Sequence, residues 1–191
     1  MKGDRVIDIA KFRRSWTGED LCDFIAVSIY TGLRISDVAT FHADRIQPDG
    51  LVKLWAIKNG CPVSVVIPPW LLQRLQARAA KFGALIFGDH DTEDLNVKTD
   101  LWRRKLNRLW SLCGPWEHHP TPHRFRHTFA RIHLAGGMSV AALARLMGDS
   151  EGIVRKHYSA WIPEHQERLN EETRVSQASF EGRRKLIIPD C

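Results

Sequence analysis

The stretch PHRFRHTFA, residues 122–130, contains two histidines, two arginines and two phenylalanines within nine residues. Thr121 can cap a helix here, and Pro122 suits its first turn, where a missing N–H costs nothing. On such a helix, His123 and Arg126 lie three residues apart and project from the same face, while the phenylalanines lie on another face and can be buried. The stretch therefore predicts one helix with a basic, imidazole-bearing face and an apolar face.

Three interpretations of this basic face are open from the residues alone. His123 and His127 could form a metal pair four residues apart, but Arg124 and Arg126 would repel a cation, and the flanking helix adds no carboxylate. An anion fits better, because a guanidinium binds two phosphate oxygens while a neutral imidazole donates or accepts a proton. The third interpretation is an ordinary solvated helix face.

Periodicity and turn residues predict the other elements. A helix capped at Thr17 ends at Gly32, and two β-rich runs flank an Asn-Gly turn typical of a hairpin. The expected segments are helices at 18–31, 36–45, 70–82, 101–112, 122–135 and 139–147, helical residues 153–162, and strands 51–57 and 63–67. This pattern predicts a mainly α fold with a small antiparallel β-sheet, in the α+β class.

Composition limits the class of protein. A chain of 191 residues with 43% hydrophobic content can bury one good core. The net charge of +6 and pI near 9.4 suit a polyanionic partner. The four cysteines are far apart, which predicts neither a zinc ribbon nor a disulfide framework. Because no long apolar run or signal peptide is visible, we expect a cytoplasmic protein that does not enter a membrane.

Three further residues stand in segments that could serve a site. Arg34 follows a glycine break in YTGLRISDVATF, Lys58 lies at the hairpin turn IKNGCP, and Tyr158 lies in VRKHYSAW among basic residues. Taken singly, each also fits an ordinary role: an exposed arginine at a helix start, a solvated turn lysine and a packing tyrosine.

In their order, these segments resemble the catalytic domain of the tyrosine recombinases, the phage integrase family of DNA strand-exchange enzymes. The resemblance spans residues 17 to 165, and the block TGLRISD has Asp37 where glutamate is commoner in the family. The positions that match the family's functional residues are Arg34, Lys58, His123, Arg126 and Tyr158. The resemblance implies the DNA breaking-rejoining fold.

One position departs from the family pattern. After the glycine of VAALARLMGDS the family usually has histidine or tryptophan, whereas this sequence has Asp149, nine residues before Tyr158. A carboxylate repels a phosphate. We expect Asp149 at the rim of the site, where it either turns outward, with His157, His118 or His119 as a substitute donor, or reduces activity.

The resemblance also implies a mechanism. Tyr158 would attack a DNA phosphorus to give a 3′-phosphotyrosyl link, with Arg34 and Arg126 binding the phosphate oxygens. Lys58 would protonate the leaving 5′-oxygen, and His123 would act as acid or base. No metal, ATP or other cofactor is required. The implied partner is double-stranded DNA, with a monomer in isolation and a homotetramer on DNA.

The resemblance divides the chain into a catalytic domain at residues 1–170 and a C-terminal tail at 171–191, whose apolar end, Leu186 to Ile188, could dock on a neighbouring protomer. Because the family's DNA-clamping domain is not seen before it, we expect a catalytic fragment of a longer integrase or a naturally truncated gene.

Two rival functions remain open at this point. A member of the same fold could bind DNA with lost or reduced catalysis, as Asp149 would suggest. Alternatively, SVAALARLMGDS and the following EGIVRKHYSAW, residues 139–161, could form a helix-turn-helix regulator. The regulator leaves Arg34, Lys58 and the His-Arg pair without a role.

Overall fold

The computed structural model describes residues 17–88 and 94–181. Helix α1, Gly18–Thr31, begins with a reciprocal cap in which the Thr17 backbone N–H donates to Asp20 at 2.6 Å. It ends at Gly32, which has φ 64°. A Cβ at Gly32 would lie 2.4 Å from the ring of Phe129, so only glycine fits this close approach. The predicted helix is confirmed, and its end is pressed against the helix that carries Arg126.

The predicted hairpin is also confirmed. Strands β1, Leu51–Trp55, and β2, Pro62–Val66, pair antiparallel and alternate buried with exposed residues. The loop between them is longer than the two-residue Asn-Gly turn that we predicted. The Ala56 N–H donates to the Cys61 carbonyl, and the Gly60 N–H donates back to the Ala56 carbonyl, each at 2.8 Å. Residues 57–60 therefore form a four-residue loop.

The remaining elements are mostly helical. They are α2 Ile35–Ala39, the 3₁₀ turn η2 Ala43–Arg45, α3 Pro69–Phe82, α4 Leu95–Cys113, α5 His123–Ala135, α6 Val140–Met147, α7 Glu151–Tyr158, the 3₁₀ turn η3 Ser159–Trp161 and α8 Pro163–Glu181. The mainly α class with a small antiparallel sheet is thus confirmed.

Some helix ends differ from the expected ones. Helix α4 begins at Leu95 because the Asp94 side chain accepts from the Asn96 N–H, a cap placed before the apolar periodicity starts. Helix α2 ends at Ala39, earlier than expected, and has Arg34 rather than Ser36 at its N-cap position. Helix α5 has Pro122 rather than Thr121 at that position.

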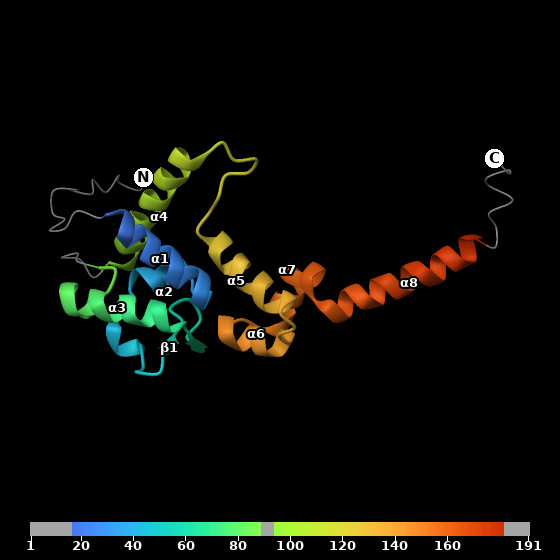
Figure 1. Cartoon of the computed structure of the whole chain (residues 1–191), viewed down its shortest axis with the longest axis horizontal. Coiled ribbons are helices and arrows are strands. Elements are labelled where there is room, and N and C mark those ends of the chain that lie inside the picture. The colour runs from blue at the N-terminus through green and yellow to red at the C-terminus, as the bar shows by residue number, and fades with distance from the viewer. Residues whose placement is uncertain (1–16, 89–93, 182–191) are drawn as a thin grey trace, which may run out of the picture.

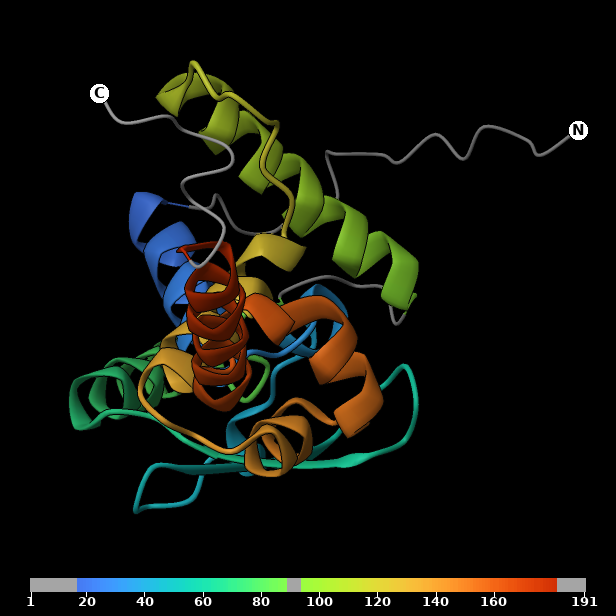
Figure 2. The same ribbon diagram turned by 90° about the vertical axis from the view of Figure 1, so that its right-hand side faces the viewer.

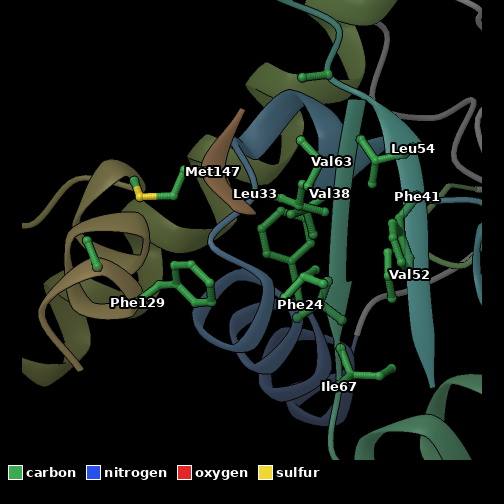
Figure 3. Packing of buried hydrophobic residues seen from close by; sticks show 14 of the residues in the cluster. Phe24, Leu33, Val38, Phe41, Val52, Leu54, Val63, Ile67, Phe129 and Met147 are labelled. Carbon is green, nitrogen blue, oxygen red and sulfur yellow. The ribbon is translucent and has the colours of Figure 1, made fainter. Parts of the chain in front are cut away.

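The core lies between α1, the hairpin and the surrounding helices. Phe24 of α1 stacks on Trp102 of α4 with ring centroids 3.9 Å apart, and both are fully buried. Figure 3 shows Phe24, Val38 and Val63 packed between α1 and the hairpin, with Phe129 and Met147 beside them. This packing fixes the ends of α1, α5 and α6 relative to one another, and these ends carry the candidate site.

Helix α8 projects away from the rest of the molecule (Figure 1) and is seen nearly end-on after a quarter turn (Figure 2). The boundary that we expected between residues 170 and 171 falls inside this continuous helix. The apolar end at Leu186 to Ile188 lies outside the described residues. Within the described ranges, no helix has the length and apolar character needed to cross a membrane.

Candidate active site

Two arginines from distant segments converge on one carboxylate. Arg34 Nη2 donates to Asp149 Oδ1, and Arg126 Nη2 donates to Asp149 Oδ2, both at 2.6 Å. All three side chains are at most 15% exposed. We call this group, Arg34, Arg126 and Asp149, the arginine cradle. Two guanidiniums that converge in this way have the geometry to bind a small anion with at least two oxygens.

Arg34 is placed by the turn that ends α1. Gly32 reverses the chain in the left-handed region, and Arg34 then stands at the N-cap position of α2 with extended backbone. Its Nη1 atom is buried and has no hydrogen-bond partner in the described part of the chain, while Nη2 donates to Asp149. The guanidinium therefore retains donor capacity that the protein does not use in this state.

Arg126 joins three segments. Its Nη1 donates to the Gly32 carbonyl at 2.7 Å, and its Nη2 donates to the Met147 carbonyl as well as to Asp149, each at 2.6 Å. Burial lowers the pKa of this guanidinium, and the Asp149 carboxylate opposes that shift. Arg126 thus links the ends of α1 and α6 in addition to being part of the cradle.

Asp149 turns inward, so the first of the two alternatives for this residue, an outward turn with a substitute donor, is wrong. Gly148 ends α6 with φ 59°, and the Asp149 N–H donates to the Ala144 carbonyl at 2.9 Å, as in a Schellman motif. Ser150 then caps α7, so the backbone is fixed on both sides. The physical reason for the inward side chain is charge: two largely buried guanidiniums need a counterion.

The histidines proposed as substitute donors do not join Asp149 in this arrangement. His118, His119 and His157 are all exposed, and the His119 ring lies 6.1 Å from that of Trp110. Of the histidines whose side chains are described, His127 has the ring nearest to Tyr158, with centroids 5.4 Å apart. Sequence reasoning weighed His127 only as a metal ligand, and no local signal pointed to this contact.

Tyr158 is the last residue of α7 and is only 3% exposed. Its ring packs against His127 and lies 6.3 Å from Trp161. Burial raises the pKa of the phenol, and the charge of Asp149 raises it further, whereas Arg126 lowers it. Tyr158 is therefore within electrostatic range of the cradle, and Asp149 opposes its ionisation.

His123 is the first residue of α5. Its ring meets that of His127 edge-on, with centroids 4.7 Å apart. Partial withdrawal from water lowers the pKa of His123, and the neighbouring His127, Arg126 and Arg34 lower it further, whereas the Asp149 carboxylate opposes that shift. The imidazole is therefore neutral at neutral pH and able to accept a proton.

Lys58 lies in the exposed loop at residues 57–60 and makes no hydrogen bond or ion pair with any described residue. The loop itself is anchored. Asp37 accepts from the Ile57 N–H at 2.8 Å, and Asn59 Nδ2 donates to the Gly148 carbonyl at 2.7 Å. Sequence reasoning gave Asn59 only a turn role, because its partner lies 89 residues away.

The pKa values of three histidines on α5 predict how stability depends on pH. His123, His127 and His133 have pKa values lowered from 6.5 in the folded chain, chiefly by burial. The unfolded chain therefore binds protons that the folded chain does not, and stability falls as pH drops through 6.5 toward the folded values. We expect a lower urea midpoint at about pH 5.5 than at about pH 7.5.

The matched variant for this prediction is the pair His123→Gln with His127→Gln, which should reduce the loss of midpoint on acidification. An unchanged or rising midpoint in the parent chain would contradict the lowered pKa values.

The sequence profile described as the phage integrase family matches residues 17–161. The chain is 25% identical over 153 residues to "Tyrosine recombinase XerA" of Thermococcus kodakarensis, in a match that covers 75% of this chain and 52% of that protein. The matched region thus spans about half the length of this relative.

The fold is similar to that of solved recombinases. The catalytic domain of bacteriophage HP1 integrase has a TM-score of 0.54 and 20% identity, and the match covers 80% of this chain and 81% of that chain. A lambda integrase tetramer bound to a Holliday junction has a TM-score of 0.55 and 18% identity, with coverage of 69% and 41%. Since the family profile takes in most of the sequence, including every cradle residue and Tyr158, the chain belongs to the phage integrase family.

Proposed function

We propose that this chain is the catalytic part of a site-specific DNA recombinase and that it cleaves and rejoins double-stranded DNA through Tyr158. The observation that carries this proposal is the arginine cradle, in which two guanidiniums separated by 92 positions hold one anion within electrostatic range of a buried tyrosine. Membership of the family and the DNA-bound relatives support the same conclusion.

In the proposed mechanism the scissile phosphate replaces the Asp149 carboxylate. A carboxylate and a phosphodiester both present two anionic oxygens to a guanidinium, so Asp149 stands in for the phosphate when DNA is absent. Entry of the phosphate requires Asp149 to leave Arg34 and Arg126. Each of these charge-assisted hydrogen bonds is worth about 1.5–3 kcal/mol, so the exchange lowers the net affinity of the cradle for DNA phosphate.

The covalent step transfers the phosphoryl group without an external energy source. The Tyr158 oxygen attacks phosphorus, the bond from phosphorus to the 5′-oxygen breaks, and the phosphotyrosyl link keeps the bond energy for rejoining. We assign the phenol proton to His123 as base, and the proton for the leaving 5′-oxygen to Lys58 as acid.

Ionisation of the tyrosine is the costly part of this step. A phenol with a pKa near 10 is about a thousandth ionised at neutral pH, a deficit of roughly 4 kcal/mol. The Arg126 guanidinium offsets part of it, and departure of Asp149 removes a charge that opposes ionisation. Asp149 thus opposes both phosphate binding and formation of the nucleophile.

We further propose that the isolated chain is a monomer and that it acts on DNA as a homotetramer whose C-terminal tail docks on a neighbour. The support is the structural similarity to a lambda integrase that forms a tetramer on a Holliday junction. Sedimentation of the free chain and of its complex with DNA would test the two states.

A second function is favoured by a specific observation. Because Asp149 already occupies the cradle, a member that binds DNA without cleaving it also fits the structure. The two functions differ in one product: only the active recombinase becomes covalently linked to DNA.

The deciding experiment uses a pool of nicked duplexes with randomised sequence on both sides of the nick. Loss of the short fragment after cleavage traps the covalent complex, which survives denaturation and yields the preferred sequence on amplification. Recovery of such complexes supports the recombinase. DNA retardation with no covalent complex, from this chain and from an Asp149→His variant, would instead support the non-cleaving function.

Asp149 provides a separate prediction. Asp149→His should raise the rate of adduct formation, since histidine can donate to a phosphate oxygen. Asp149→Ala should be neutral or mildly faster, because it removes the competing anion without adding a donor. It should also bind inorganic phosphate more tightly and lose about 1–3 kcal/mol of stability, because two guanidiniums are left without their counterion.

Calorimetric phosphate titration, urea unfolding and adduct kinetics measure these effects. Loss of cleavage in Asp149→Ala with intact folding and DNA binding would show that Asp149 orients the arginines productively instead of blocking them.

A further inference from the structure

On both sides of Lys58, the loop is hydrogen-bonded to segments that carry residues of the arginine cradle. On one side the Ile57 N–H donates to Asp37 Oδ1, three residues after Arg34. On the other side Asn59 Nδ2 donates to the carbonyl of Gly148, the residue before Asp149. The residues that flank Lys58 are therefore each bonded to a cradle segment, while Lys58 itself has no described partner.

The contact between Asn59 and Gly148 is built into the packing. A Cβ at Gly148 would lie 2.9 Å from Val63 Cγ2 and 3.5 Å from Cys61 Cβ, so β2 meets the end of α6 at close range. The helix cap uses the Ala144 and Arg145 carbonyls, which leaves the Gly148 carbonyl for Asn59. The Asn59 amide also accepts, through Oδ1, from the Cys61 N–H at 3.4 Å.

We propose that Asn59 is a positioning residue that holds the Lys58 ammonium at a fixed place relative to the arginine cradle. Lysine has a long, flexible side chain, so its reach is useful to catalysis only if its backbone is held. A general acid must approach its target oxygen within hydrogen-bond distance. This inference rests on the proposed function, in which Lys58 protonates the leaving 5′-oxygen.

A positioning role and a purely structural role differ in their expected effects on stability and on the cleavage rate. Asn59 is an exposed residue, and a single neutral hydrogen bond contributes little to stability. We therefore expect Asn59→Ala to unfold at nearly the parent urea concentration. A displaced catalytic group, by contrast, should lower the cleavage rate by about 10- to 100-fold.

Replacement of the 5′-bridging oxygen by sulfur separates these roles chemically. A thiolate leaving group has a conjugate acid with a pKa near 8.5, so it departs without the proton that an alkoxide requires. In both substrates the tyrosine oxygen forms the new bond to phosphorus, and only the proton demand of the leaving atom differs. A variant that has lost only the acid, or its position, should recover its rate on the sulfur substrate.

The experiment measures single-turnover cleavage of oxygen and sulfur duplexes of the sequence recovered from the randomised pool. The variants are Asn59→Ala, Asn59→Asp and Lys58→Ala, with Ser64→Ala as an exposed control on the same hairpin. Asn59→Asp keeps the acceptor for the Cys61 N–H but directs a carboxylate oxygen at the Gly148 carbonyl. If the contact with Gly148 is what matters, Asn59→Asp should be as slow as Asn59→Ala on the oxygen substrate.

The expected result is that both Asn59 variants and Lys58→Ala are slow on oxygen and close to the parent chain on sulfur, with Ser64→Ala unaffected throughout. If Lys58→Ala is rescued by sulfur but Asn59→Ala is not, or if Asn59→Asp keeps the parent rate, the positioning role is wrong and the proposed function stands. If sulfur does not rescue Lys58→Ala, the assignment of Lys58 as acid is wrong. Absence of cleavage by the parent chain would overturn both.

Discussion

Replacing Tyr158 with phenylalanine is expected to abolish the covalent complex with nicked DNA and to leave DNA binding near that of the parent chain. The phenol oxygen is the atom that forms the bond to phosphorus, so no slower version of the same step remains. The ring contacts with His127 and Trp161 do not need the hydroxyl, so packing at this buried position should persist. Denaturing electrophoresis measures the complex, and mobility shift measures binding.

Tyr30 is the matched control, because it is the second of the two tyrosines in the chain. It is 43% exposed, and its ring meets Trp70 edge-on. Tyr30→Phe should therefore form the complex at the parent rate. A complex that persists in Tyr158→Phe, or that disappears in Tyr30→Phe, would reject Tyr158 as the nucleophile.

Replacing Arg34 with alanine should lower the cleavage rate by about 10²- to 10³-fold, as expected for loss of one oxyanion donor, or roughly 3–4 kcal/mol of transition-state stabilisation. DNA binding should weaken only modestly and remain dependent on salt, because many other phosphate contacts contribute to affinity. Arg34 is the cleaner test of the cradle, since among the described residues its side chain donates a hydrogen bond only to Asp149. Arg126→Ala should lose both rate and stability, because that side chain also binds the Gly32 and Met147 carbonyls.

Arg174→Ala serves as the charge-matched control, since Arg174 is 73% exposed on α8 and pairs with Glu171. It should change neither rate nor stability appreciably. A loss of DNA affinity in Arg34→Ala as large as its loss of rate would make Arg34 an ordinary DNA contact, and the cradle would then have no special role in the transition state.

Local signals predicted the elements whose ends are set by neighbouring residues. The Thr17 cap, the αL glycines at 32 and 148 and the Ser139 cap act over one helical turn, so sequence spacing locates them. The hairpin followed from alternation, although its loop is longer because the bond between Ala56 and Cys61 closes it. Helix α4 was expected to start too late because its first turn is polar and lacks the apolar spacing that marks a helix.

These local signals did not predict the contacts between distant segments. Sequence spacing placed Arg34 and Arg126 on their helices, but the inward turn of Asp149 follows from a charge balance between segments 115 and 23 residues apart. The bond from Asn59 to Gly148 and the buried ion pairs of Arg78 with Asp20 and Asp23 have the same origin. Each of these contacts depends on which surfaces the fold brings together, so the local sequence within one helical turn does not predict it.

Peptide mapping of the covalent complex tests the role of Tyr158 most directly. The complex is digested with nuclease and trypsin, and the peptide that carries the residual nucleotide is sequenced by mass spectrometry. We predict that the nucleotide is linked through phosphorus to the tyrosine of HYSAWIPEHQER, residues 157–168. A nucleotide on the peptide that contains Tyr30, or on any serine, would contradict cleavage by Tyr158.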